Sequence, residues 1–368
     1  IDTVVRLGGD EFVLLLANVQ GQDDILPVMQ RILSAVAEPC VINEMDFLVT
    51  SSIGVSLYPD DSRDSTKLLI NADSAMYHAK KHGRNNFHIY TPSINIELNE
   101  RVMLEYKLRL AIENNEFLLH YQPKVDFSTG LIIGVEALIR WQPPDEELIP
   151  PVRFIQIAEE SGLIEAIGLW VLREACYKAK EIRQNTGYTI PVAVNVSPYQ
   201  FKKANFVETV RQILAETQLD PSCLELEITE NTLIDDAEKF IEILHSLKGM
   251  GVKLAIDDFG TGYSSLAYLK DFPVDRLKID KAFVSNLEND AANEAILKTI
   301  VILGQSLGKK VVAEGVETSY QYDYLKAIGC DELQGYYFSK PIPASALEAL
   351  LVINKQPQGG NLLVFPKV

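Results

Sequence analysis

Acidic residues recur in the second half of the chain, at the carboxyl ends of segments that alternate apolar and polar residues as β-strands do. These acids are Glu136, Glu227, Asp257, Asp258 and Glu314. So many carboxylates at one end of a set of strands would repel one another unless cations neutralised them. With the amide of Asn195, such oxygen ligands favour Mg²⁺ or Mn²⁺ over zinc. Two ions about 3.5–4 Å apart, bridged by a shared carboxylate, would form an arrangement that cleaves phosphodiesters.

Simpler explanations exist for each of these acids alone. A single acid at a strand end is more often solvated than a ligand, and Glu225 and Asp280 fit satisfied polar groups of a core. A solvated rim does not explain a set of acids that spreads over most of the strands. A second chemistry is an enolase-type reaction in which Lys278 abstracts a carbon-bound proton, but it leaves Asn195 and the pair Asp257–Asp258 unexplained.

The elements that must position these residues alternate regularly from about Asn99 onward. Strands are expected at 117–126, 131–141, 191–197, 223–229, 252–258, 275–280, 310–316 and 331–339, and helical stretches separate most of them. Eight strands with helices over roughly 250 residues have the size of a (β/α)8 TIM-like barrel, an α/β fold. In LELEIT, Glu225, Glu227 and Thr229 share one face of the strand and apolar residues the other. The apolar face must meet the helices, so the polar face is expected to point into the barrel.

The first region alternates strand and helix from Phe12 to Tyr90 and predicts a partial α+β domain. It begins with RLGGDEF, where Gly8 and Gly9 precede Asp10 and Glu11. That pattern suits either a hairpin turn or a turn that holds a phosphate and a cation. The expected boundaries are 1–92 for this domain, 93–100 for a polar linker, 101–355 for the barrel and 356–368 for a tail.

Composition limits the classes of function. The net charge is −17, from 34 basic and 51 acidic residues, which argues against binding a nucleic-acid polymer or an anionic membrane surface. No apolar run approaches the roughly 20 residues of a membrane span. The four cysteines are far apart and form no CxxC pair, so we expect a reduced, cytoplasmic chain. The first residue, Ile1, lies within a strand–turn–strand pattern. We therefore expect a longer parent protein that continues upstream and could be anchored in a membrane by that upstream region.

From about Asn99 to about Val352, the second region resembles the EAL family of cyclic di-GMP phosphodiesterases. Motifs that carry the resemblance, in order, are YQPKV, GVEALIRW, VNVSPYQF, LELEITE, AIDDFGTGYSSL, LKIDKAFV, VVAEGVE and LQGYYFSKP. RLGGDEF, TSSIGVSLYP and ADSAMYHAKKHGRNNFHIY resemble the C-terminal part of a GGDEF domain, which is nucleotide-cyclase-like. The sequence departs from the EAL pattern at Pro143-Pro144 and the acids 145–147, a change in loop shape away from the expected ligands.

The resemblance implies a role for each matching position. Its metal ligands fall on Glu136, Asn195, Glu227, Asp257, Asp258 and Glu314. Lys278 and Gln334 match residues at the attacking water, and the residues that match substrate contacts are Gln122, Leu138, Arg140, Asp258 and Glu317. The loop Asp258–Ser265, steadied by Glu230, matches the stretch that couples the metal site to a dimer contact, although an ordinary βα connection would look similar.

The reaction that this resemblance implies is hydrolysis of cyclic di-GMP to linear pGpG with two Mg²⁺ or Mn²⁺ ions, in a homodimer. The alternatives are a receptor that binds cyclic di-GMP without cleaving it, and a full-length parent that also synthesises it. The signature Gly8, Gly9, Asp10 and Glu11 would then bind GTP, and we expect a regulatory role for this part. The histidines look uninvolved in that reaction: His78, His82, His88, His120 and His245.

Overall fold

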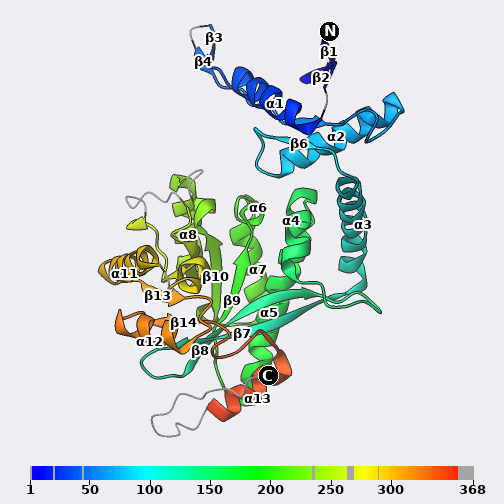
Figure 1. Ribbon diagram of the computed structural model, residues 1–368. Coiled ribbons are helices and arrows are strands. Elements are labelled where there is room, and N and C mark those ends of the chain that lie inside the picture. The colour runs from blue at the N-terminus through cyan, green and yellow to red at the C-terminus, as the bar shows by residue number, and fades with distance from the viewer. Residues whose placement is uncertain are drawn as a thin grey trace. The chain divides into compact units, whose positions relative to one another are not determined.

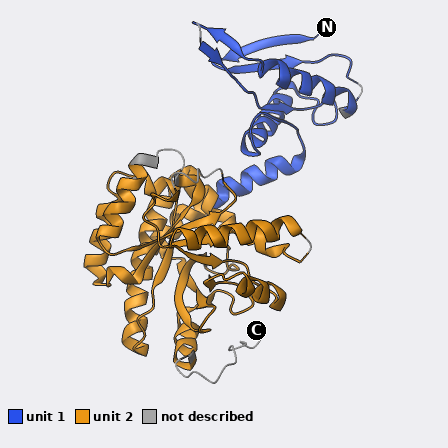
Figure 2. Cartoon of the chain, turned by 90° about the vertical axis from the view of Figure 1, so that its left-hand side faces the viewer, with its two compact units in different colours: residues 1–104 blue, residues 105–368 orange. Residues whose placement is uncertain are grey.

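The computed structural model describes residues 2–19, 21–43, 45–233, 237–262, 269–288 and 290–354. The chain divides into two compact units, residues 1–104 and residues 105–368, which Figure 2 shows in blue and orange. Each unit is described below by itself.

Unit 1 contains short strands and two helices before the helix that ends it. The elements are β1 Thr3–Gly8, β2 Glu11–Leu15, α1 Gln22–Val36, β3 Cys40–Ile42, β4 Met45–Phe47, β5 Ile53–Val55, α2 Ser65–Lys81 and β6 Phe87–Ile89. Two antiparallel hairpins, β1–β2 and β3–β4, accompany the parallel pair β5–β6, whose strands α2 connects. The helix begins after Asp64, whose carboxylate accepts from the backbone N–H groups of Thr66 and Lys67. A Cβ on Gly54 would lie 1.9 Å from the backbone oxygen of Ala72, so this glycine lets α2 pack directly on β5.

Helix α3, Pro92–Asn114, passes from the first unit into the second. The expected linker 93–100 lies inside this helix, and the division between the units falls within it, after Leu104. The reason is local: proline is tolerated at the first position of a helix, and no glycine or further proline follows before Asn114. The polar composition of residues 93–100 therefore reflects a helix that is largely exposed to solvent.

Unit 2 is a closed barrel, and Figure 1 shows its strands from the side. Its strands are β7 Phe117–Asp126, β8 Ile132–Trp141, β9 Val192–Val196, β10 Leu224–Thr229, β11 Lys253–Phe259, β12 Arg276–Ile279, β13 Lys310–Ala313 and β14 Glu332–Leu333. Each strand pairs with the next, and β14 pairs with β7 to close the ring. The expected TIM-like barrel is confirmed.

One strand departs from the all-parallel pattern of a (β/α)8 barrel. β7 is antiparallel to both β8 and β14, whereas the pairs from β8 to β14 are parallel. The reason is the connection between β7 and β8, which spans only residues 127–131 and is too short for a crossover. A further short strand, β15 Ile342–Pro343, also pairs with β7.

Helices surround the strands in Figure 1. They are α4 Pro151–Ser161, α5 Ile164–Thr186, α6 Pro198–Phe201, α7 Phe206–Thr217, α8 Ala237–Gly249, α10 Lys281–Ser285, α11 Ala291–Ser306, α12 Ser319–Ala327 and α13 Ala344–Asn354, with 3₁₀ turns η1 Pro221–Cys223 and η2 Glu230–Leu233. Leu224, Leu226 and Ile228, on one face of β10, are at most 1% exposed, as the alternation predicts. None of the helices in the described part of the chain is both long and apolar enough to cross a membrane.

Candidate active site

The acids that the sequence singled out converge at the carboxyl ends of the barrel strands. Glu136 lies on β8, Glu227 on β10 and Asp257 on β11, and all three side chains are buried. Glu227 is in register with Asn195 of β9, and Asp257 with Thr229 at the end of β10. Glu314 follows β13 directly. Parallel strands therefore bring residues far apart in the sequence to one mouth.

Lys278 of β12 stands among these acids. Its Nζ lies 2.5 Å from a carboxylate oxygen of Glu227, 2.6 Å from one of Glu314 and 3.0 Å from one of Asp257. Burial alone would lower the pKa of Lys278, but the surrounding carboxylates outweigh it and raise the pKa well above its ordinary value. A lysine held in its charged form is a poor proton-abstracting base, so this geometry disfavours the enolase-type alternative.

Two amides hold Glu136. The Nδ2 atom of Asn195 donates to its Oε1 at 2.6 Å, and the Nε2 atom of Gln334 donates to its Oε2 at 2.6 Å. Gln334 Nε2 also donates to Oε1 of Gln122 at 2.9 Å. The Oε1 atom of Gln334 is buried and finds no hydrogen-bond partner among the described residues. An unpartnered buried acceptor beside a carboxylate cluster fits a bound water or ion.

Negative charge exceeds positive charge at this mouth. Burial, then Asp257, raises the pKa of Asp258 to about 6. Burial, together with Asp257, Glu136 and Glu227, raises the pKa of Glu314 to about 8, against the opposing effect of Lys278. Lys278, together with Lys124, which Glu227 shares with Glu225, does not compensate so many carboxylates, and such an excess is costly unless cations join it. These oxygen donors fit hard divalent cations such as Mg²⁺ or Mn²⁺.

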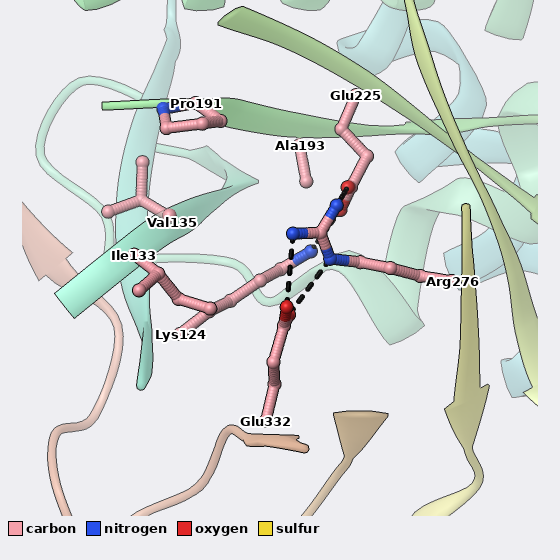
Figure 3. A pocket seen from close by; sticks show the side chains of 9 residues that line it. Lys124, Ile133, Val135, Pro191, Ala193, Glu225, Arg276 and Glu332 are labelled. Carbon is pink, nitrogen blue, oxygen red and sulfur yellow. Dashed lines mark hydrogen bonds and ion pairs between the residues drawn. The ribbon is translucent and has the colours of Figure 1, made fainter. Parts of the chain in front are cut away.

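The opposite end of the barrel is balanced in charge. Figure 3 shows that Arg276 reaches Glu332 and Glu225 there, and that Lys124 points to the same place. Arg276 lies 2.8 Å from Glu332 and 2.7 Å from Glu225, whose other oxygen is 2.7 Å from the Lys124 ammonium. The void between these residues measures about 10 Å³, the lower limit for one water. Glu225 is thus a satisfied core polar group, as one sequence interpretation held.

Comparison with known proteins identifies the barrel. Residues 105–341 match the family model described as the EAL domain, and residues 1–86 match the one described as the diguanylate cyclase GGDEF domain. The chain belongs to the EAL domain family. This confirms the resemblance on which the sequence interpretation rested.

Curated relatives align with most of the chain, across both units. The bifunctional diguanylate cyclase/cyclic di-GMP phosphodiesterase MucR of Pseudomonas aeruginosa is 44% identical over 348 residues, which are 95% of this chain and 51% of MucR. The cyclic di-GMP phosphodiesterase PdeR of Escherichia coli is 37% identical over 345 residues, or 94% of this chain and 52% of PdeR. The chain spans about half the length of these curated relatives.

Solved EAL structures resemble unit 2. The structure of the MucR phosphodiesterase in complex with c-di-GMP is 47% identical, covers 67% of this chain and 99% of its own, and superposes with a TM-score of 0.65. The EAL domain of DcpA from Mycobacterium smegmatis is 38% identical, covers 64% of this chain and 96% of its own, and gives a TM-score of 0.55.

Glu230 of the EAL domain anchors the start of the loop after β11. Its Oε2 accepts from the backbone N–H groups of Gly260 at 2.7 Å and Gly262 at 3.4 Å. A Cβ on Gly262 would lie 2.7 Å from Asn231 Oδ1 and 2.9 Å from Glu230 Oε1, so a larger residue there would displace these side chains. The preceding Asp258 has φ +53°, an uncommon conformation for a residue with a side chain. Residues 263–265 of the expected loop lie outside the described residues.

The expected substrate contacts fall into two groups. Gln122 joins the acids through Gln334, and half-buried Leu138 and Arg140 follow Glu136 on the same face of β8. Glu317, in contrast, is exposed ahead of α12, and its recorded contact is a backbone N–H that donates to Gln321. The described contacts therefore do not bring Glu317 into the acid cluster.

The sequence analysis did not single out Lys124, which the EAL domain buries at 2% exposure. It contacts Glu227 as well as Glu225, with Nζ 2.5 Å from Glu227 Oε1. The sequence contained an indication of this role. Lys124 lies two residues after Gln122 on β7, so both side chains are on the inward face of that strand.

In unit 1, the GGDEF signature forms the turn of the β1–β2 hairpin. Gly8 pairs with Glu11, and Gly9 has φ +53°. The Arg6 guanidinium donates to the backbone oxygen of Gly9 at 2.6 Å, which closes the turn. Asp10 and Glu11 are exposed there.

Proposed function

We propose that the EAL domain of this chain hydrolyses cyclic di-GMP to linear pGpG with divalent ions at the mouth of its barrel. The observation that carries this proposal is the excess of buried carboxylates around Lys278. The identity of the substrate is inferred from relatives that are named cyclic di-GMP phosphodiesterases and from the MucR complex with c-di-GMP. The family membership supports the same reaction class.

The residues that would hold two Mg²⁺ or Mn²⁺ ions are Glu136, Asn195, Glu227, Asp257, Asp258 and Glu314. Asn195 turns its amide nitrogen to Glu136, which leaves its oxygen free for a cation. When bound, the ions supply Lewis-acid activation of water and of the phosphate oxygens.

The protein's own groups then have separate tasks. Lys278 presents a permanent positive charge where charge develops on the phosphoryl oxygens. The unpartnered Oε1 of Gln334 accepts a hydrogen bond from the attacking water and orients it. Arg140 offers a planar fork of donors to the second phosphate. Water adds to phosphorus, the bond to the 3′ oxygen breaks, and the products are a 5′-phosphate and a 3′-hydroxyl.

Chromatographic analysis of the products tests this proposal. The full chain should convert cyclic di-GMP to pGpG with Mg²⁺ or Mn²⁺ but not with EDTA, and Glu136→Ala should abolish turnover. The exposed Glu208→Ala on α7 is the matched control and should leave turnover unchanged. Binding of cyclic di-GMP without turnover in the presence of either metal would instead favour the receptor alternative.

Two features of the whole protein extend the proposal. The loop that Glu230 anchors would couple the metal site to a homodimer contact, and the GGDEF turn would bind GTP and regulate the barrel, both in the cytoplasm. Light scattering should give the mass of a dimer, and GTP should change the rate of cyclic di-GMP hydrolysis. A monomer whose rate is indifferent to GTP would remove both extensions without affecting the hydrolysis itself.

A further inference from the structure

Three histidines of unit 1 lie together, although they are separated in the sequence. His78 and His82 stand one turn apart on α2 and its C-terminal cap, and His88 is the middle residue of β6. One nitrogen from each ring lies within 4.8 Å of those of the other two. The centroids of the His78 and His82 rings are 3.9 Å apart, and those of His78 and His88 are 4.5 Å apart. This spacing would let the three rings bind one metal ion together.

The local fold brings the third histidine to the other two. Gly83, Arg84 and Asn85 all have positive φ, so the chain turns sharply after α2 and enters β6. β6 pairs with β5, on which α2 packs through Gly54. The close packing of α2 on β5 thus places His88 beside His78 and His82.

Within the described part of the chain, the hydrogen bonds leave one nitrogen unengaged on each of the two helical histidines. His82 Nδ1 lies 2.9 Å from the backbone oxygen of His78, and because a carbonyl only accepts, this nitrogen carries the proton and Nε2 is a free acceptor. His78 Nε2 lies 3.3 Å from a carboxylate oxygen of Glu97 on α3, whereas His78 Nδ1 is buried and finds no hydrogen-bond partner among the described residues. Metal-binding histidines are held in this way, with the second nitrogen turned to a carbonyl or carboxylate.

The surroundings of His88 favour its neutral form. Burial, then the neighbouring His78 and His82, lowers the pKa of His88 below its ordinary value. Neutral imidazole is the form that binds a metal, while three protonated rings at these distances would repel one another. Stacked imidazoles on a solvated helix end would explain the ring contacts, but not a buried and unpartnered nitrogen on His78.

We propose that His78, His82 and His88 form a zinc site in unit 1, with Glu97 orienting His78. Imidazole nitrogens suit Zn²⁺, in contrast to the oxygen donors of the barrel, which suit Mg²⁺ or Mn²⁺. Three histidines leave a fourth tetrahedral position for water. The ion would join the end of α2 to β6, and through Glu97 it would also fix the start of α3. The proposal is independent of the reaction in the barrel.

Metal content of the full chain provides the test. Protein stripped with a chelator and then equilibrated with micromolar Zn²⁺ in excess Mg²⁺ should retain one equivalent of zinc after gel filtration, measured by mass spectrometry. The triple variant His78→Gln/His82→Gln/His88→Gln should lose that equivalent. Glu97→Gln should bind zinc about 10-fold more weakly. His245→Gln changes an exposed histidine of α8 and is the matched control, so it should retain the full equivalent.

A second measurement separates zinc binding from misfolding. The melting temperature of the stripped triple variant should equal that of the stripped wild type, and added Zn²⁺ should raise only the wild-type value. Co²⁺ in place of Zn²⁺ should give the visible absorption of a tetrahedral complex in the wild type and in Glu136→Ala, but not in the triple variant. A wild type that retains no zinc, or a triple variant that retains as much as the wild type, would overturn the proposal.

Discussion

Lys124 reaches Glu227 from the floor of the barrel, with its Nζ 2.5 Å from Oε1 of that carboxylate, while Lys278 holds the other oxygen from the mouth at the same distance. Lys124 also contacts Glu225, so one buried cation serves two buried acids. Glu227 therefore links the charge network that stabilises the barrel to the one that we propose for catalysis.

Lys124→Met should destabilise unit 2 strongly. The substitution leaves the Glu227 and Glu225 carboxylates buried with one cation fewer, and breaking a buried pair in this way costs about 3–5 kcal/mol. Urea denaturation followed by circular dichroism measures the loss. Lys178→Met, which removes an ion pair whose partner Glu181 is exposed, is the control and should cost about 1 kcal/mol or less. Equal effects of the two substitutions would contradict the role given to Lys124.

Lys278→Met should reduce kcat for cyclic di-GMP by about 10²–10³-fold, as the loss of one preorganised donor does in other enzymes. Because the lysine faces the acids, we expect the Kd for the dinucleotide to change much less. Stopped assays with Mn²⁺ give kcat, and titration with the substrate in EDTA gives Kd. A variant with wild-type kcat would show that Lys278 serves the fold alone.

Protonation of Glu225 should reduce the stability of unit 2 as the pH falls. Burial would raise the pKa of Glu225, but Lys124 and Arg276 outweigh it and hold the pKa at about 2, below the ordinary value of 4.5. Because the folded value is the lower one, this contribution is complete above pH 4.5 and is lost as the pH falls toward 2. Plotting the free energy of unfolding against pH should show this slope, and Glu225→Gln should flatten it. An unchanged slope in Glu225→Gln would assign the acid sensitivity to other groups.

Glu230→Ala should slow turnover by about 10-fold or more. The carboxylate holds the N–H groups of Gly260 and Gly262, and without it the backbone that follows Asp257 and Asp258 loses its anchor. Glu230→Gln keeps an acceptor oxygen and should recover most of the rate in the same assay. If the glutamine variant is as slow as the alanine variant, charge rather than the hydrogen bond is the property that matters.

Local patterns of the sequence were sufficient for the barrel, and they placed the acids of the candidate site at its mouth. Alternation along LELEIT assigns Glu225 and Glu227 to the interior of the barrel. The positions of the strand ends predict which acids lie at its mouth. The contact between Gln334 and Glu136 could not be read in this way, because 198 positions separate them and only closure of the ring by β14 and β7 joins them. The role of Lys124 depends on the same closure.

Two local patterns do not show on their own what the structure makes of them, because long-range contacts decide it. The polar segment 93–100 has the composition of a linker, yet it continues a helix that packs at its far end. His78 and His82 form a visible i, i+4 pair, but the third histidine joins them only through the pairing of β5 and β6. The order strand, helix, strand is compatible with this parallel pairing, but the register that sets His88 opposite Gly54 is a long-range property that the local pattern does not give.

The reversed direction of β7 also determines where force would enter the catalytic domain. Because this strand runs against its neighbours, its first residues lie at the mouth of the barrel, next to the ends of the parallel strands that carry the acids. Helix α3 ends at Asn114, immediately before β7 begins at Phe117. A pull or a twist on α3 would therefore be transmitted along a single strand to Gln122, whereas in an all-parallel barrel the same tension would arrive at the inert floor.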